Sequence, residues 1–427
     1  MAVNTKHRPC LPDLVIDQIL RRLPTKAAVR MSFLSKQWEG VWSLLPSLDF
    51  DEGGNPDHYY HYNHVVDTEN LLGHKRFVNN ILAKYLEYRQ KDEKKDVLDE
   101  LKIRMVRYLG RDATLINKWL DFSFERSVKE LDISLRISKL HWNIRDGGLC
   151  FYYCLSRRTF LNAKSLTALN LECVRIKNVY HKTASEPTIY ISLLPSLKTM
   201  CLKSVYLENS ALMFLIRECP SIESLSLASC SFECSLFFVS STSLKSLEVK
   251  HCTAKNVMVH EAVNLESFTF VSAHFPLDSI VLNNSDNLKY IHIHAQHLQT
   301  ISLFGCHESV KATIDTSNLL SLQFHGYVSY SKVSVKAPNL RAASIELWDV
   351  WDEELCTIDD PWKHFHALRD FLKEFGFLES LLLYVPDFKM PNTEAWDTLN
   401  FSFDGSIKEL DIALELEICI RIIGTMG

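Results

Sequence analysis

The sequence predicts an α+β protein, in which a small N-terminal three-helix module precedes a solenoid of short repeats with a curved, mainly parallel sheet. Two observations support this prediction. Residues 9–50 carry apolar side chains at helical spacing between prolines, and the chain beyond residue 126 returns repeatedly to one strand-like phrase. With 427 residues, 47% of them apolar, the chain has material for one small and one large unit.

The first fifty residues indicate three short helices. The first begins near Pro12 and ends by Leu23, because Pro24 disfavours helical geometry in the residue before it. Thr25 is placed to cap a second helix and Ser35 a third. The module offers more apolar surface than so small a unit can bury, which predicts a partner; a bundle packed on the rest of the chain is the alternative. The apolar stripe of the first helix consists of Ile16, Ile19, Leu20 and Leu23.

This module resembles an F-box, which docks on the Skp adaptor of cullin-type ubiquitin ligases, and in particular the plant F-box proteins with leucine-rich repeats. The resemblance rests on Leu11-Pro12, Ile19-Leu20, Leu23-Pro24, Ser35, Trp38, Trp42 and Leu48-Asp49-Phe50. It implies a helix-in-groove contact with a Skp-type adaptor and, through it, a cullin. The residues expected to dock are Leu11, Pro12, Ile16, Ile19, Leu20, Leu23, Pro24, Trp38 and Trp42, although some of them must instead form the small core of the module.

A phrase of the form LxxLxL recurs from Ser127 to Phe377, and it is the strand signature of a leucine-rich repeat. The step between phrases is 22, 21 and 23 residues from Ile222 to Leu288 and 21 residues from Leu298 to Leu340. The phrase at Leu298 follows its predecessor by only ten residues and indicates a half-length turn. A second alternating run in each regular period favours a second strand over a helix. A sandwich of short strands is the alternative, but it needs no fixed step.

These patterns divide the chain into an N-terminal tail (1–8), the F-box (9–50), a linker and helical transition (51–126), leucine-rich repeats (127–386) and a C-terminal segment (387–427). The last segment is hypothesised to be a truncated duplicate of the first repeat. Residues Phe401–Leu414 repeat Phe122–Leu135 at ten of fourteen positions and are expected to leave an open sheet edge. Members of the resembling family often end in a further small domain, which is not identifiable after Phe377.

One segment before the repeats and one within them are less regular. The triplet His58, His61 and His64 has a spacing that suits a metal on a helix, but neighbouring Gly and Pro residues favour a solvated loop. The acidic, aromatic insertion Trp348–Pro361 is expected to pack over the solenoid edge, with partner binding as the alternative. A helix that docks on the first repeats is expected at Phe77, Ile81, Tyr85 and Tyr88.

Composition and motif content argue against several classes of function. The net charge of -5 provides no basic field for nucleic acid, and no apolar run reaches the length of a membrane span. The 12 cysteines form no CxxC pair, so we expect no metal and no disulfide framework; Cys230, Cys252 and Cys306 are expected to close repeat turns. No phosphate loop, nucleophile elbow or zinc-binding helix is present, so we expect no enzymatic activity and no cofactor. A cytoplasmic or nuclear location is expected.

In LxxLxL the leucines point inward, so the residues between them are expected to line the concave sheet. Together with the resemblance, this predicts a substrate-recognition adaptor that holds an unknown target protein at the ligase. The alternative is a repeat protein outside any ligase that binds a partner or senses a small molecule, with His292, His294 and His325 in its pocket. The candidate substrate face comprises Glu172, Lys203, Glu248, Lys250, Tyr290, His292, His294, Phe304, Gln323, His325, Glu346 and Tyr384.

Overall fold

The structure is a computed structural model in which the chain forms two compact units. The first unit comprises Met1–Ile176 and Leu193–Leu197, and the second comprises Lys177–Ser192 and Lys198–Gly427. The domain boundaries expected from the sequence stay predictions. The residues described are 12–20, 22–31, 38, 45–51, 68–89, 98–105, 108–136, 152–155, 157–160, 162–177, 194–208, 211–234, 236–272, 277–284, 287–306, 310–327, 332–348, 366, 369–370, 375, 378–384, 409–413 and 419–423.

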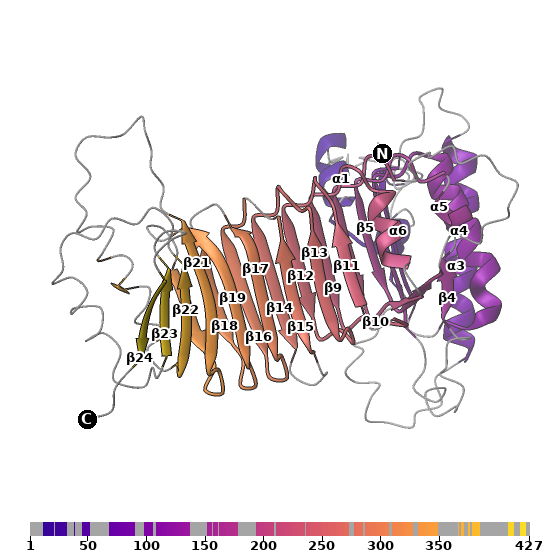
Figure 1. Cartoon of the computed structure of the whole chain (residues 1–427). Helices are drawn as coiled ribbons and strands as arrows, with labels where there is room; N and C mark the ends of the chain where they lie inside the picture. Colours follow the sequence, from indigo (N-terminus) through magenta and orange to yellow (C-terminus); the bar gives the residue numbers. More distant parts are fainter. Residues whose placement is uncertain are drawn as a thin grey trace, which may run out of the picture. The chain divides into compact units, whose positions relative to one another are not determined.

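The described part of the first unit contains six sheet strands and several helices (Figure 1). Its helices are α1 (Asp13–Leu20), α2 (Thr25–Met31), α3 (Thr68–Arg89), the 3-10 turn η4 (Gly110–Asp112), α4 (Ala113–Glu125) and α5 (Arg157–Phe160). Its strands are β1 (Ser47–Asp51), β2 (Glu100–Met105), β3 (Glu130–Leu135), β4 (Tyr153–Leu155), β5 (Ala168–Glu172) and β6 (Val174–Ile176). Strands β1, β2, β3 and β5 pair in parallel in that order, and β4 pairs in parallel with β6.

Two prolines open the first two helices. The carbonyl of Pro12 accepts hydrogen bonds from the N–H groups of Val15 and Ile16 at 2.9 and 3.1 Å. The carbonyl of Pro24 does the same for the first turn of α2. The third predicted helix and the histidine triplet lie outside the described residues, apart from Trp38 and a few residues after it. No described helix combines the length and the apolar composition that a bilayer crossing requires.

The helix predicted in the linker is confirmed as α3. Its Tyr85 is fully buried, meets the ring of Phe122 edge-on at 5.9 Å between centroids, and donates a hydrogen bond to the carbonyl of Leu45 at 3.2 Å. The indole N–H of Trp119 on α4 donates to Oδ1 of Asn79 at 2.9 Å. These contacts attach α3 to α4 and to the segment that enters β1.

A buried ion pair also links α3 to the turn before α4. Lys75 pairs with Asp112, and their side chains are only 7% and 6% exposed. The same carboxylate oxygen of Asp112 accepts the backbone N–H of Leu109 at 3.0 Å. Because a buried charge is costly without its partner, this pair fixes how α3 approaches α4.

We expect Asp112→Asn to lower the free energy of unfolding by about 3–5 kcal/mol, because it leaves the buried Lys75 ammonium without a counter-charge. The midpoint of urea unfolding measures this loss. Asp121→Asn, at an exposed position of the following helix α4, is the matched control. An equal effect of both substitutions would contradict the structural role of the pair.

The second unit is built almost wholly from strands. Among its described residues, α6 (Ala211–Arg217) packs on β11, and His366, Arg369 and Asp370 are also helical. Its first strands are β7 (Thr199–Lys203), β8 (Tyr206–Leu207), β9 (Ser224–Ala228), β10 (Ser231–Phe232), β11 (Leu236–Ser240), β12 (Ser246–Lys250), β13 (Asn256–His260), β14 (Ser267–Ser272) and β15 (Ser279–Asn283). The remaining strands are β16 (Tyr290–Ala295), β17 (Thr300–Cys306), β18 (Lys311–Asp315), β19 (Ser321–Tyr327), β20 (Lys332–Lys336), β21 (Ala342–Trp348), β22 (Ser380–Tyr384), β23 (Glu409–Ala413) and β24 (Cys419–Ile423).

These strands form two layers (Figure 1). The first sheet of this unit has the order β7-β9-β12-β14-β16-β18-β20, and the second has the order β11-β13-β15-β17-β19-β21-β22-β23-β24. Strand β8 pairs separately with β10. All neighbouring strands described in this unit are parallel except β23 and β24. Each coil of chain from β12 to β21 therefore contributes one strand to each sheet, which confirms the second strand predicted in every regular period.

The half-length turn changes which sheet carries the repeated phrase. Up to β16 the phrase lies in the first sheet, as in β9, β12 and β14. The phrase at Leu298 becomes β17, and the phrases after it become β19, β21 and β22, all in the second sheet. The alternating runs at β18 and β20 take over the first sheet instead. Either sequence fits either sheet, because both place an apolar residue inward at every second position.

Side chains at the turns tie each coil to the one before it. The amides of Asn264, Asn287 and Asn339 donate to backbone carbonyls of the preceding coil at 2.6, 2.7 and 2.8 Å. The thiol of Cys230 is buried and donates to the carbonyl of Leu202 at 3.3 Å. Cys252 occupies the equivalent place one coil later and donates to Leu227 at 3.8 Å. The predicted role of these two cysteines in closing turns is confirmed. The side chain of Cys306 is not among those that the structure describes.

The core of this unit consists of in-register apolar rows. Strand β12 places Leu247 opposite Leu225 of β9 and Phe268 of β14, and all three are at most 1% exposed. The neighbouring residue Thr269 points outward and is partly exposed. Each inward side chain is thus covered from both sides by the adjacent coils.

We expect Phe268→Ala to cost about 3–5 kcal/mol of unfolding free energy, because the cavity it leaves lies between two stacked coils. Thr269→Ala on the outer face is the control and should change stability by no more than about 0.5 kcal/mol. Urea unfolding of both variants tests the packing; similar losses would contradict it.

The copied C-terminal phrase also forms a strand. Strand β23 pairs in parallel with β22 and antiparallel with β24. Among the described residues β24 is the last strand of this sheet, so the expectation of an open edge at the C-terminal strand stays a prediction. The insertion Trp348–Pro361, apart from its first residue, lies outside the described residues.

Candidate functional site

The predicted adaptor-docking residues fall into two groups in the structure. Ile16 and Leu20 are 1% exposed and Trp38 is 8% exposed, so the chain itself buries these three side chains. Pro12 and Pro24 are exposed, and Ile19 and Leu23 are partly exposed. Leu11 and Trp42 lie outside the described residues.

An accessible apolar face remains on α1. Val15 is 37% exposed and lies three residues after Pro12 and four before Ile19, so the three share one side of the helix. Sequence reasoning missed Val15 because it followed the stripe of Ile16 and Leu20, which proves to be the buried side. The four-residue step from Val15 through Ile19 to Leu23 was the signal that could have identified it.

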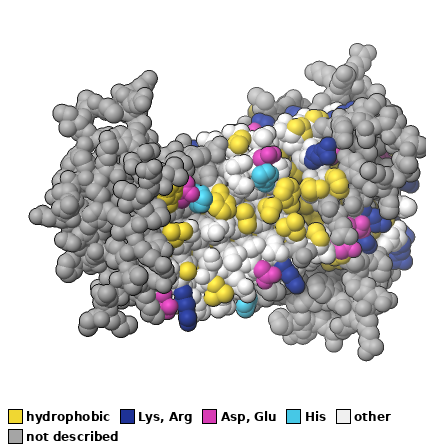
Figure 2. Space-filling view, viewed as in Figure 1, with side chains coloured by type: hydrophobic (Ala, Val, Ile, Leu, Met, Phe, Trp, Pro, Cys, Tyr) yellow, Lys and Arg dark blue, Asp and Glu magenta, His cyan; other side chains and the backbone are white. Residues whose placement is uncertain are grey.

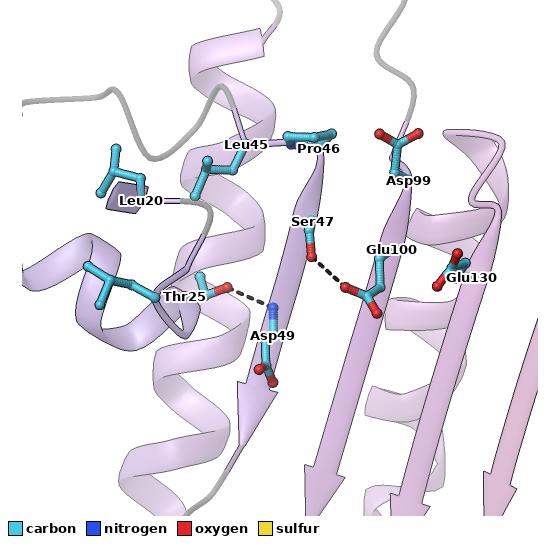
Figure 3. A pocket seen from close by; sticks show the side chains of 10 residues that line it. Leu20, Thr25, Leu45, Pro46, Ser47, Asp49, Asp99, Glu100 and Glu130 are labelled. Atoms are coloured by element: carbon cyan, nitrogen blue, oxygen red, sulfur yellow. Dashed lines mark hydrogen bonds between the residues drawn. The ribbon is translucent and has the colours of Figure 1, made fainter. Parts of the chain in front are cut away.

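Beside this module lies a pocket of about 300 Å³, which is part apolar and part acidic (Figure 3). Leucines from the end of α1 and from the segment before β1 line one side. Carboxylates at the starts of β2 and β3 line the other, together with Asp49 of β1. The lining residues are Leu20, Leu23, Thr25, Leu45, Pro46, Ser47, Asp49, Asp99, Glu100 and Glu130.

Most polar groups of the pocket are engaged within the chain. Ser47 donates to Glu100 at 2.9 Å, and Thr25 Oγ1 accepts the backbone N–H of Asp49 at 2.7 Å (Figure 3). Asp99 pairs with Lys129 at 2.7 Å. These bonds attach the start of α2 to β1 and β1 to β2, so the pocket joins the N-terminal module to the first strands of its unit.

Asp49 carries an electrostatic penalty. Burial raises the pKa of its carboxyl above the usual 3.8, and the nearby cations Lys102 and Arg104 only partly oppose this shift. Its Oδ1 atom is buried and has no hydrogen-bond partner among the described residues. The charged form of this side chain is therefore less favourable in the folded chain than in water.

We expect Asp49→Asn to raise the melting temperature at neutral pH. Because the folded-state pKa lies above the unfolded value of 3.8, the folded chain binds more protons between the two values, and stability falls as pH rises through that window. Below pH 3.8 both proteins have a neutral side chain and their melting temperatures should converge. Asp121→Asn is the control, and a pH-independent difference would contradict this account.

The structure divides the predicted substrate face between two sheets. Glu172 lies on β5 of the first unit, where it accepts a hydrogen bond from Ser134 at 2.6 Å. The residues on the first sheet of the second unit are Lys203, Glu248, Lys250, Tyr290, His292 and His294. Those on its second sheet are Phe304, Gln323, His325, Glu346 and Tyr384. The expectation that one concave sheet carries the whole set is wrong, because the half-length turn moves the later phrases to the other sheet.

On the first sheet, charged residues at the strand starts alternate in sign from coil to coil. Glu223 lies between Lys198 at 3.5 Å and Lys245 at 2.9 Å, and in the next coils Glu266 meets Lys289 at 3.8 Å. Lys245 lowers the pKa of the Glu223 carboxyl through its hydrogen bond. Further along, Tyr290 is 54% exposed beside the Lys311 ammonium, 5.9 Å from its ring centroid.

On the second sheet, four predicted residues come together in one row. The rings of Phe304 and His325 meet edge-on at 4.5 Å, and His325 Nδ1 lies 3.3 Å from the carboxylate of Glu346. Glu346 stands opposite Tyr384 in the strand register. The alternative pocket of His292, His294 and His325 is not assembled, because His325 lies on a different sheet from the other two.

The outer face of the second sheet also carries exposed apolar side chains that sequence reasoning missed. Figure 2 shows them gathered toward the end of the sheet that holds β11 and β13. Leu236 is 44% exposed and Met258 is 36% exposed, with Phe238 and Val281 partly exposed beside them. The repeat signature does not point to them, because they lie on β11, β13 and β15, outside the LxxLxL phrase.

The described residues contain no cluster of three or more potential metal ligands. Burial raises the pKa of the Cys219 thiol to about 12, which makes it a poor nucleophile. The chemistry that these surfaces offer is that of recognition: apolar anchors, aromatic rings and paired charges.

Comparison with known proteins matches both parts of the chain to families. Residues 9–49 match the F-box domain, and residues 116–316 match the family described as FBD-associated F-box protein At5g56370, LRR repeats. The predicted resemblance to plant F-box proteins with leucine-rich repeats is confirmed.

Several Arabidopsis thaliana proteins are similar to this chain. The FBD-associated F-box protein At5g22730 is 31% identical over 222 residues, which cover 50% of this chain and 38% of that protein. The F-box/FBD/LRR-repeat protein At3g52680 is 27% identical over 219 residues, covering 51% and 39%. The FBD-associated F-box protein At3g52670 is 26% identical over 263 residues, covering 61% and 52%. The matched region thus spans 38% to 52% of the length of these relatives.

Proposed function

We propose that this chain, which belongs to the F-box proteins with leucine-rich repeats, is a substrate-recognition adaptor of a Skp-Cullin-F-box ubiquitin ligase. The observation that carries this proposal is an F-box match over residues 9–49 in a module whose first helix keeps an apolar face accessible. The F-box binds a Skp-type adaptor and through it a cullin, while the repeats hold a target protein. The chain acts in the cytoplasm or nucleus.

The docking contact centres on the exposed side of α1. Pro12, Val15 and Ile19 present an apolar strip that a groove on the adaptor covers, as in other helix-in-groove contacts. Ile16, Leu20 and Trp38 support this strip from behind by packing inside the module. Their substitution would act on folding first and on docking only as a consequence.

The function follows from tethering and needs no chemistry from this chain. A target held on the repeats is kept near the ligase, so its effective concentration at the site of ubiquitin transfer rises. The described side chains support recognition in this way, because they form rows of aromatic, apolar and paired charged groups over the two sheets. The catalytic steps belong to other subunits.

We expect Val15→Glu to reduce co-purification of the full chain with a Skp-type adaptor at least about tenfold, because it places a charge in an apolar contact. Thr114→Glu is the matched control, since Thr114 is exposed on α4 and receives the same side chain. Circular dichroism of both variants checks that they fold.

Undiminished adaptor binding by a folded Val15→Glu variant would overturn the docking assignment. Failure of the wild-type chain to bind any Skp-type adaptor would instead favour a recognition protein that works outside a ligase.

A further inference from the structure

The outer face of the second sheet differs from that of the first in its lack of charge. At the outward positions of β11, β13, β15 and β17 there is no Lys, Arg, Asp or Glu. Glu346 of β21 is the first carboxylate further along, and it is already engaged by His325. The first sheet, in contrast, carries Lys203, Glu248 and other charges on its outward positions. Depletion of charge together with exposed Met, Leu and aromatic residues is the composition of interface centres.

Strand register turns the apolar residues into a continuous patch. Phe238 stands opposite Met258, and Met258 stands opposite Val281, so the three lie in one row across β11, β13 and β15. Leu236 lies two residues before Phe238 on the same side of β11, which makes the patch two rows wide there. Because the strands pair in register, the row runs straight across the sheet, with about 4.8 Å between neighbouring strands. Figure 2 shows this face open.

The size of the face selects the kind of partner. The outward surface of β11, β13, β15 and β17 covers about 300 Å², from the spacing of strands and of residues along them. A stable dimer of standard size buries about 800 Å² on each partner. A narrow occupant fits better, and the apolar stripe of a single amphipathic helix has the width of two residue rows. A helix is also the element that most readily covers the free face of a sheet.

We propose that this face, centred on Met258, binds the uncharged apolar side of an amphipathic helix in a partner protein. The helix lies across β11, β13, β15 and β17, with its leucine-like side chains against Phe238, Met258 and Val281. The inference rests on the proposed function in one respect only, namely that the partner is then the target held for ubiquitination.

The test uses the purified full chain and a fluorescein-labelled helical peptide of about 18 residues, made of Leu, Glu and Lys with zero net charge and all leucines on one side. A peptide of the same composition with its leucines spread around the helix is the reference. Fluorescence anisotropy should show at least about tenfold tighter binding of the one-sided peptide. Met258→Lys should weaken that binding at least about tenfold.

The matched control is Thr313→Lys, which puts the same side chain at the exposed centre of β18 on the first sheet and should leave the affinity within about twofold. Equal binding of the two peptides, or equal loss in the two variants, would overturn the proposal. So would sedimentation showing a dimeric wild-type chain that Met258→Lys makes monomeric, because a second copy would then occupy the face.

Adaptor co-purification is measured on the same preparations. Intact peptide binding without adaptor binding would count against the ligase role and not against this surface. Intact adaptor binding with no preference for the one-sided peptide would count against this surface and not against the ligase role.

Discussion

The second unit depends on one constraint, the in-register stacking of parallel strands from successive coils. Each inward residue lies directly over its counterpart in the previous coil, as Leu247 does over Leu225, and is covered by the next one. No coil has a core of its own, so burial is shared between neighbours along the stack. A shift of one residue would turn every apolar side chain of a strand outward, and the repeat length therefore tolerates little change within a coil.

The same constraint shapes the surface. In-register stacking brings equivalent positions of successive coils side by side, so identical charges there would repel. The series Lys198, Glu223, Lys245 avoids this by alternating in sign, with contacts at 3.5 and 2.9 Å. Exposed ion pairs of this kind add little stability. They do favour the correct strand register, because a shifted pairing would lose the contacts between opposite charges. The second sheet meets the same requirement with outward residues from β11 to β17 that carry no Lys, Arg, Asp or Glu, and the apolar row of Phe238, Met258 and Val281 lies among them.

The repeats were predictable because their strands obey a short periodic rule, and every phrase identified in the sequence became a strand. The assignment of strands to sheets was not predictable from that rule. Both strands of a coil alternate apolar and polar residues in the same way, so nothing local distinguishes β16 from β17. On α1 the spacing of the apolar residues does not separate the buried side chains of Ile16 and Leu20 from the more accessible Val15 and Ile19, because all of them recur at helical steps. Side-chain pairs such as Lys75 with Asp112 join residues too far apart in sequence for any local pattern to reveal.

The ten-residue step before Leu298 has an evolutionary implication. Inserting or losing half a coil leaves the hydrophobic interior intact, since either strand suits either layer, yet it exchanges which stretches of sequence look out from each side of the molecule. A single insertion or deletion of half a coil can thus change the set of residues exposed on each sheet. Point substitutions would need many separate steps to do the same. Two related proteins that differ by such a step would expose homologous residues on opposite sheets, where they could contact different partners.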